Sequence, residues 1–268
     1  MNFDPKVLRK RVLDMAFGGQ TVHVACAFSI IEILSVLYTR FLHFDRANPA
    51  SDDRDVFVLS KGHGVMALYA VFREIGWVSD EELACYFSDS SRLHGLADAQ
   101  VPGIEATAGS LGHGLPIATG IALGLKRRGE SDRSVFCLVG DGEMNEGSMW
   151  ESLLFASHHA LGNLCVIVDA NQFQAMGRTS EILNLEPLTE KFTAFGFDAV
   201  ECDGHDTAAV EEALITLRGR RTIGSSRPQA LIARTIKGHG VSFMSGENSW
   251  HYLRLDADTH ARAVAEIE

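Results

Sequence analysis

The sequence lacks features that would point to a membrane or a nucleic acid. It has no run of about 18 apolar residues, which a membrane-spanning helix needs. Its first residues, MNFDPKVLRKRV, contain no apolar core of a signal peptide, so we expect no leader. Positive charge is in deficit, because 24 lysines and arginines stand against 35 aspartates and glutamates, a net charge of −11. This balance disfavours general binding to nucleic acids or anionic membranes, which require a positive surface.

Cysteine is scarce and shows no paired pattern. The five cysteines are scattered, odd in number and form no CxxC pair. Three of them lie in apolar runs, so we expect buried, reduced thiols and a cytoplasmic protein. The overall composition, with 46% apolar and 22% charged residues, is that of an ordinary globular protein. A chain of 268 residues can bury a substantial core.

Short apolar runs alternate with helical patterns along most of the chain. Runs rich in Val, Ile and Leu predict strands at residues 55–60, 134–140, 163–171, 197–204 and within 228–240. Helical spacing predicts helices at residues 5–17, 29–42, 64–76, 115–129, 146–161, 185–196 and 207–219, with Ser29 as an N-cap and Gly76 as a C-cap. This alternation predicts one α/β domain, a mostly parallel sheet with helices on both faces.

Residues 88–114 interrupt this alternation. The stretch is dotted with Gly and Ser and shows little periodicity. A loop of this length inside a compact domain is usually functional.

Polar residues follow two of the predicted strands, in the sequences VGDGE and VDANQF. Asp141 and Asn171 lie 30 residues apart, about one strand–helix–strand step, and parallel α/β sheets bind ligands at the carboxyl ends of their strands. A carboxylate, an amide oxygen and the Phe173 carbonyl form an oxygen set suited to Mg²⁺ or Ca²⁺. Taken singly, Asp141 is more simply a helix cap and Asn171 a turn cap. The occurrence of both residues at this spacing favours a metal site.

The same residues carry a family resemblance. GDG followed by this spacing and Asn resembles the thiamine-diphosphate signature. The segments RDVFVLSKGHG, GIEATAGSLGHGLPIATGIALGLK, GDGEMNEGSMWESLLFASHHALGNLCVIVDANQFQ and IKGHGVSFM…SWH match, in order, the N-terminal, diphosphate-binding domain of transketolase. The resemblance covers nearly all of residues 1–268 and is greatest for split transketolases, in which this thiamine-diphosphate-binding domain is a separate chain.

The resemblance implies a role for each matching residue. Three of them, Asp141, Asn171 and the carbonyl of Phe173, would hold Mg²⁺, with Ca²⁺ as the other candidate. His23 and His251 would contact the substrate and move protons, a role suited to an imidazole pKa near about 6.5. Glu146 would contact a catalytic glutamate of a partner chain. The residues implied to bind the cofactor are His63, Gly109, Ser110, Leu111, Gly142, Glu143, Asn171, Lys237 and His251.

The activity implied is transfer of a two-carbon ketol unit from a ketose to an aldose, with thiamine diphosphate supplying the carbanion chemistry. The family also needs a glutamate from a second, pyrimidine-binding domain. We therefore expect the partner to be a separate transketolase C-terminal subunit, in a two-plus-two heterotetramer. Sugars or sugar phosphates would be the substrates, and neither a nucleic acid nor a membrane would be a partner.

Two other functions share part of this pattern. The α subunit of another thiamine-diphosphate enzyme, of the 2-oxoacid dehydrogenase or decarboxylase type, also has GDG and the later Asn, but the SKGHG and KGHGVSFM…SWH segments argue against it. A non-catalytic cofactor-binding module is the second alternative, and the intact Asp141, Asn171, His63 and Lys237 argue against that.

The chain departs from the family at two positions, of which Leu96 is substrate-facing. Leu96, in GLA, stands where the family usually shows the histidine of GHP, and Cys26 stands where Gly or Ser is usual. We expect an altered sugar substrate as a result. The alternative is that His94, two residues earlier, reaches into the same space and restores the ordinary specificity.

Overall fold

A five-stranded parallel sheet forms the centre of the protein. The computed structural model describes residues 3–222 and 224–267. The strands are β1 (Val56–Leu59), β2 (Val135–Gly140), β3 (Leu164–Ala170), β6 (Asp198–Asp203) and β7 (Gln229–Arg234), in the order β1-β2-β3-β7-β6. Every neighbouring pair is parallel, which confirms the α/β fold expected from the alternating sequence pattern.

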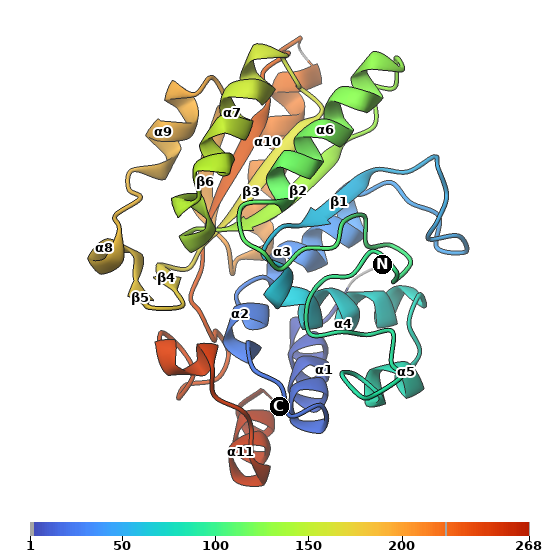
Figure 1. Ribbon diagram of the computed structural model, residues 1–268, viewed down its shortest axis with the longest axis vertical. Coiled ribbons are helices and arrows are strands. Elements are labelled where there is room, and N and C mark those ends of the chain that lie inside the picture. The colour runs from blue at the N-terminus through green and yellow to red at the C-terminus, as the bar shows by residue number, and fades with distance from the viewer. Residues whose placement is uncertain (1–2, 223, 268) are drawn as a thin grey trace.

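Helices cover both faces of this sheet, because alternate residues of each strand point to opposite sides. Phe136 and Leu138 of β2 belong to one apolar core, whereas Val135 and Cys137 belong to the other. The first core is closed by α1 (Pro5–Gly18), α3 (Ile31–Val36), α4 (Val65–Ile75) and α10 (Thr207–Thr222). The second is closed by α6 (Gly114–Arg127), α7 (Gly147–His158) and α9 (Leu188–Ala194). In Figure 1, α6 and α7 lie in front of the strands and α10 lies behind them.

Several short elements complete the described chain. They are α2 (Val24–Phe28), a π-helical turn (Leu37–Phe41), α5 (Asp80–Ala84), α8 (Thr179–Ile182), α11 (Ala257–Ile267), the hairpin β4 (Phe173–Gln174) and β5 (Gly177–Arg178), and 3₁₀ turns at Gly62–Gly64, Gly142–Asn145 and Asn248–His251. No helix within residues 3–222 and 224–267 is long and apolar enough to cross a bilayer.

One helix start differs from the sequence expectation. Ser29 follows α2 as its C-cap, in a helical backbone conformation, and α3 begins only at Ile31. The Ser29 hydroxyl donates to the carboxylate of Asp169, 2.7 Å away, so it serves a buried polar contact and does not cap the helix. In contrast, Gly76 caps α4 as expected, since its φ of 88° is in the left-handed region that glycine adopts without strain.

The strand register decides where the functional residues gather. Gly140 at the end of β2 pairs with Asp169 on β3, and Ala170 pairs with Arg234 at the end of β7. The segments that follow these strands therefore leave the sheet at one edge. There the hairpin β4–β5 lies beside the segment after β7, held by a hydrogen bond of 3.1 Å from the Asn248 amide to the Ala175 carbonyl (Figure 1).

Candidate active site

A cavity of about 410 Å³ opens at the carboxyl ends of the strands. Its walls come from the start of α2, the segments after β1, β2, β3 and β7, and the long loop between α5 and α6. The lining residues that the sequence had identified are His23, His63, Gly109, Leu111, Asp141, Gly142, Glu143, Glu146, Asn171, Phe173, Lys237 and His251. Ser110 does not line the cavity: it is exposed, and its carbonyl contacts the His113 ring instead.

The oxygen set is buried at this edge of the sheet. Asp141 and Asn171 are 3% and 7% exposed. The Asn171 side-chain nitrogen donates to Asp169 over 2.8 Å, and its amide oxygen accepts from the Phe173 backbone N–H over 3.0 Å, as a turn cap does, while keeping a second lone pair. Burial, together with the nearby Asp169 carboxylate, raises the pKa of Asp141 to about 7. A carboxylate and an amide oxygen in one buried pocket fit a hard divalent cation. Its positive charge would counteract both influences, burial and the Asp169 carboxylate, on the pKa of Asp141.

Gly142 leaves the backbone open beside this oxygen set. A side chain there would place its Cβ 2.6 Å from the Cβ of Gln174 and 3.2 Å from its Cα, on the hairpin β4–β5. No residue larger than glycine therefore fits without displacing the hairpin. The backbone at Gly142 stays accessible from the cavity, as a site for a diphosphate requires.

Sequence reasoning missed a buried ion pair behind the oxygen set. The Lys61 ammonium contacts the Asp169 carboxylate, and the two residues are 1% and 0% exposed. Burial opposes ionisation of Asp169, but the Lys61 charge and several hydrogen bonds outweigh it and hold the pKa of this carboxyl below its usual value. Each residue stands near the end of an apolar run, in VFVLSK and CVIVDA, but nothing local in the sequence pairs the two.

Three histidine rings meet in the same cavity. The ring centroids of His23 and His251 lie 5.0 Å apart, and His63 lies 5.3 Å from His23 and 5.7 Å from His251. Burial and the Lys237 ammonium lower the pKa of His23 to about 4 and that of His251 to about 3. Both values lie below the pKa near 6.5 that was expected for these imidazoles. The rings are neutral and act as hydrogen-bonding groups.

The hydrogen bonds of His251 decide which ring nitrogen carries its proton. The Lys237 ammonium donates to Nδ1 of His251 over 2.9 Å and to the Asn248 side-chain oxygen over 2.8 Å. Because Nδ1 accepts from Lys237, the proton of the neutral ring is on Nε2. The Cys26 sulfur lies 3.4 Å from the same Nδ1, so the unusual cysteine packs against this pair.

Glu143 supports the cavity wall through three hydrogen bonds. Its carboxylate accepts from the Ser60 hydroxyl over 2.6 Å and from the Gly112 and Gly140 amides over 3.0 and 3.2 Å. Burial raises the pKa of this carboxyl despite these bonds. Through these bonds Glu143 holds the loop around Gly112 in place.

Leu96 occupies the mouth of the cavity. A Cβ on Gly109 would lie 2.6 Å from Cδ1 of Leu96, so the leucine packs directly over that glycine, and it remains 43% exposed. His94 is turned away: its Nδ1 pairs with the Asp98 carboxylate over 2.9 Å, and it does not line the cavity. In this structure His94 therefore does not occupy the place of the missing imidazole.

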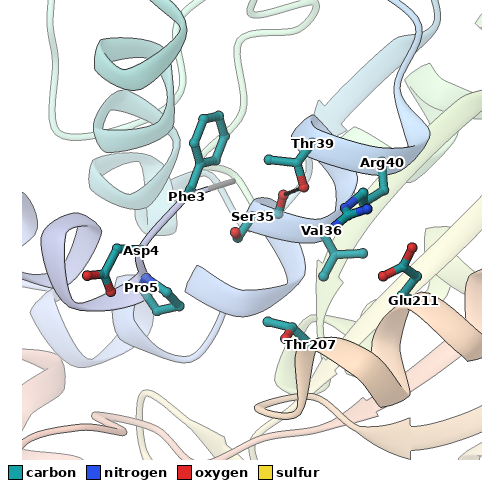
Figure 2. A pocket seen from close by; sticks show the side chains of 9 residues that line it. All are labelled: Phe3, Asp4, Pro5, Ser35, Val36, Thr39, Arg40, Thr207 and Glu211. Atoms are coloured by element: carbon teal, nitrogen blue, oxygen red, sulfur yellow. Dashed lines mark hydrogen bonds between the residues drawn. The ribbon is translucent and has the colours of Figure 1, made fainter. Parts of the chain in front are cut away.

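A second cavity, of about 440 Å³, lies at the start of α1, between α3 and α10 (Figure 2). Its polar groups include Ser35, Thr39, Arg40 and Glu211, and it shares no lining residue with the first. None of its lining residues is a histidine, a lysine or a cysteine. We therefore place the candidate active site at the strand ends.

The depressed pKa of His23 predicts a pH-dependent stability. In the unfolded chain this imidazole binds a proton near its ordinary pKa of 6.5, but in the folded chain only near pH 4. Between these values the unfolded state binds more protons, so the stability that His23 contributes is complete above pH 6.5 and is lost as the pH falls toward 4.

His23→Asn removes the titrating group, and asparagine tolerates the left-handed φ of 73° found at this position. Urea unfolding at pH 7 and pH 5 should show the wild type losing about 1–2 kcal/mol more than this variant. Equal losses in the two proteins would contradict the depressed pKa.

Comparison with known proteins gives one consistent family. The family described as transketolase, thiamine diphosphate binding domain, matches residues 6–266. An apulose-4-phosphate transketolase subunit of Actinobacillus succinogenes is 37% identical over 268 residues, covering 98% of this chain and 94% of that protein. The 6-deoxy-6-sulfo-D-fructose transketolase subunit SqwG of a Clostridium species is 37% identical over 267 residues, covering 98% and 94%. A solved transketolase from Leishmania mexicana has a TM-score of 0.88 at 28% identity, and this chain spans 40% of its length.

Proposed function

This chain belongs to the transketolase family as its thiamine diphosphate binding domain, and from that membership we propose that it is one subunit of a two-chain transketolase. The observation that carries the proposal is the pair of buried side chains Asp141 and Asn171, with Phe173 and Gly142 in the same cavity. That cavity also contains three histidines whose lowered pKa values favour the neutral ring. The whole chain, residues 1–268, would form this one domain.

The cofactor supplies, when bound, a stabilised carbanion that lets a ketose lose a two-carbon unit to an aldose. In this chain Asp141, Asn171 and the Phe173 carbonyl would hold Mg²⁺, with Ca²⁺ as the weaker candidate. The backbone at Gly142 and the His63 ring would bind the diphosphate. The loop segment Gly109–Leu111, held by Glu143, would contact the rest of the cofactor, with Ser110 contributing backbone only.

The protein groups that face the sugar would act by hydrogen bonding. His23 and His251 are neutral at pH 7, so each offers one N–H donor and one acceptor to hydroxyl and carbonyl oxygens. Lys237 donates a hydrogen bond to Nδ1 of His251, so the neutral ring presents its N–H from Nε2. Such donors stabilise charge that develops on an oxygen without adding a full charge to the site.

We propose that the partner is a separate transketolase C-terminal subunit carrying the pyrimidine-binding domain. Two relatives that this chain covers almost completely have the word subunit in their names, and this chain spans only 40% of the Leishmania enzyme. Glu146 lies at the rim of the cavity, where it would contact the partner's catalytic glutamate. The assembly that we propose is a heterotetramer with two copies of each chain.

We also propose a cytoplasmic location, with which the five free cysteines agree.

Isothermal calorimetry tests the cofactor assignment. Thiamine diphosphate should bind the chain in the presence of Mg²⁺ and not after EDTA treatment, and thiamine without its diphosphate should bind weakly in both. A chain that binds no cofactor under any of these conditions would be a module without this function. Reconstitution with the partner chain, followed by a comparison of ketoses with 2-oxoacids as donors, separates a transketolase from the 2-oxoacid dehydrogenase type.

Leu96 predicts the substrate class. An apolar side chain at the cavity mouth offers no hydrogen bond to a sugar hydroxyl, and an unmet buried hydroxyl costs about 1–3 kcal/mol. We expect the reconstituted enzyme to prefer a deoxy or branched sugar, or a phosphate of one, over xylulose 5-phosphate and ribose 5-phosphate. The sugars in the names of the two relatives, apulose 4-phosphate and 6-deoxy-6-sulfo-D-fructose, belong in the substrate panel.

Leu96→His should raise kcat/KM for xylulose 5-phosphate about 10-fold, the effect of one hydrogen bond of roughly 1.4 kcal/mol. His94→Ala is the matched control, because His94 pairs with Asp98 and does not line the cavity. Its loss should leave the ratio of kcat/KM between the substrates unchanged. Efficient turnover of xylulose 5-phosphate by the wild type, with no change in Leu96→His, would contradict the altered specificity.

A further inference from the structure

A second group of polar side chains lies behind the loop that carries Lys237. It comprises Arg9 of α1, Glu32 of α3, and His205 and His239 of two different loops. The side chains of Arg9, Glu32 and His205 are between 5% and 9% exposed. None of these four residues lines the active-site cavity.

The hydrogen bonds of His205 identify its tautomer. The backbone N–H of Ile236 donates to Nε2 of His205 over 2.8 Å, so Nε2 carries no proton. The proton is therefore on Nδ1, which lies 3.1 Å from the Glu32 carboxylate and donates to it. The neutral ring thus connects the backbone of Ile236, directly before Lys237, to a residue of α3.

The other contacts make this connection rigid. The Arg9 guanidinium pairs with Glu32 over 2.6 Å, and its Nε donates to the His239 carbonyl over 2.9 Å. The His205 and His239 rings stack with centroids 3.7 Å apart and an interplanar angle of 15°. A Cβ on Gly240 would lie 2.8 Å from Nε of Arg9, so the loop approaches the guanidinium as closely as glycine allows. Both ends of the loop around Lys237 are therefore attached to the helices behind it.

The same contacts exclude a metal site here. Glu32, His205 and His239 are close enough to share an ion. However, Arg9 already neutralises Glu32, and both nitrogens of His205 are engaged in hydrogen bonds. A cation would have to displace the guanidinium and approach its charge.

We propose that His205 is a positioning residue, which places Lys237 by accepting the hydrogen bond from the Ile236 backbone. Lys237 in turn holds Nδ1 of His251, so the hydrogen bond at His205 determines which nitrogen of His251 presents its N–H. The proposed route runs from Glu32 through His205 and the backbone at 236–237 to the His251 ring. The positioning of His251 stands on contacts within this chain, and only its effect on turnover rests on the proposed function.

The test compares two substitutions at His205. His205→Phe keeps a ring to stack on His239 but has no acceptor for the Ile236 N–H, whereas His205→Gln replaces Nε2 with an amide oxygen that accepts. His260→Leu serves as control, because His260 pairs with Asp14 on α1 and touches neither loop. The first readout is the imidazole ¹⁵N NMR spectrum of His251 in the full chain without cofactor or partner. The second is kcat of the complex reconstituted with the partner chain.

We expect a single Nε2–H tautomer of His251 in the wild type, in His205→Gln and in His260→Leu, and a mixture of tautomers in His205→Phe. The kcat of His205→Phe should fall about 10-fold to 100-fold, the usual effect of losing a group that orients a site residue, and His205→Gln should recover most of it. A single Nε2–H tautomer in His205→Phe would overturn the proposal, as would equal loss in His205→Phe and His205→Gln. If His205→Phe does not fold, His205→Leu takes its place in the same comparison. The NMR result is decisive even if the chain proves not to be a transketolase component.

Discussion

Asp141→Ala is expected to abolish Mg²⁺-dependent binding of thiamine diphosphate while leaving the fold intact. The substitution removes the only carboxylate of the oxygen set formed with Asn171 and the Phe173 carbonyl, and a divalent cation loses its main charged ligand. Removing a residue that only hydrogen-bonds to a metal ligand typically lowers metal affinity about 10-fold to 100-fold. For loss of a ligand itself we expect cofactor affinity in Mg²⁺ to fall about 100-fold or more. Isothermal calorimetry with thiamine diphosphate, with and without Mg²⁺, measures it.

The apo protein should tolerate this change. Burial and the Asp169 carboxylate oppose the charge of Asp141, whereas the N–H groups of Gly142 and Gln172 donate to it and lose this acceptor in the variant. These effects oppose each other, so the fold should persist, with a fall in Tm of about 4 °C. Asp89→Ala, at an exposed loop position, is the matched control and should bind the cofactor normally. Unchanged cofactor affinity in Asp141→Ala would refute the metal assignment.

The purified chain alone is expected to show no ketol transfer, and activity should appear when its partner chain is added. The described residues form the cavity and its oxygen set, and this chain corresponds to 40% of the Leishmania transketolase. In the proposed assembly the partner supplies the missing glutamate, and a positioned acid or base contributes about 10²-fold to 10⁴-fold to a rate. A coupled assay with the chain alone, the partner alone and an equimolar mixture measures the difference.

A mixture made with the Asp141→Ala chain should remain inactive, which shows that the activity of the complex depends on this cavity. Full activity of the isolated chain would mean that the two-chain assignment is wrong. The same mixtures, analysed by sedimentation, report whether two copies of each chain assemble.

Most of the sheet was predictable because each strand has a local signal. VFCLVG and LCVIVDA are continuous apolar runs, as expected for strands that are buried on both faces, and both form strands of the parallel sheet. The resemblance to the transketolase family is confirmed by the match over residues 6–266. The hairpin β4–β5 was not predicted, since two residues per strand leave no pattern to detect.

The start of α3 was mispredicted for a tertiary reason. Ser29 precedes an apolar helical pattern, as an N-cap does, but its hydroxyl bonds to Asp169, a residue 140 positions away. A local capping rule has no access to such a partner. The buried Lys61–Asp169 pair was missed for the same reason, since its members are 108 positions apart.

The sequence by itself determined that Asp141, Gly142 and Asn171 lie together, because parallel neighbouring strands deliver their carboxyl ends to one edge of the sheet. Only the tertiary structure decided what the histidines do. Their rings come from segments up to 228 positions apart, 251 minus 23, and meet beside Lys237 in one cavity. Burial and the lysine charge then make them neutral, and the Lys237 hydrogen bond assigns the proton of His251 to one nitrogen. Both effects depend on distances that no local pattern contains.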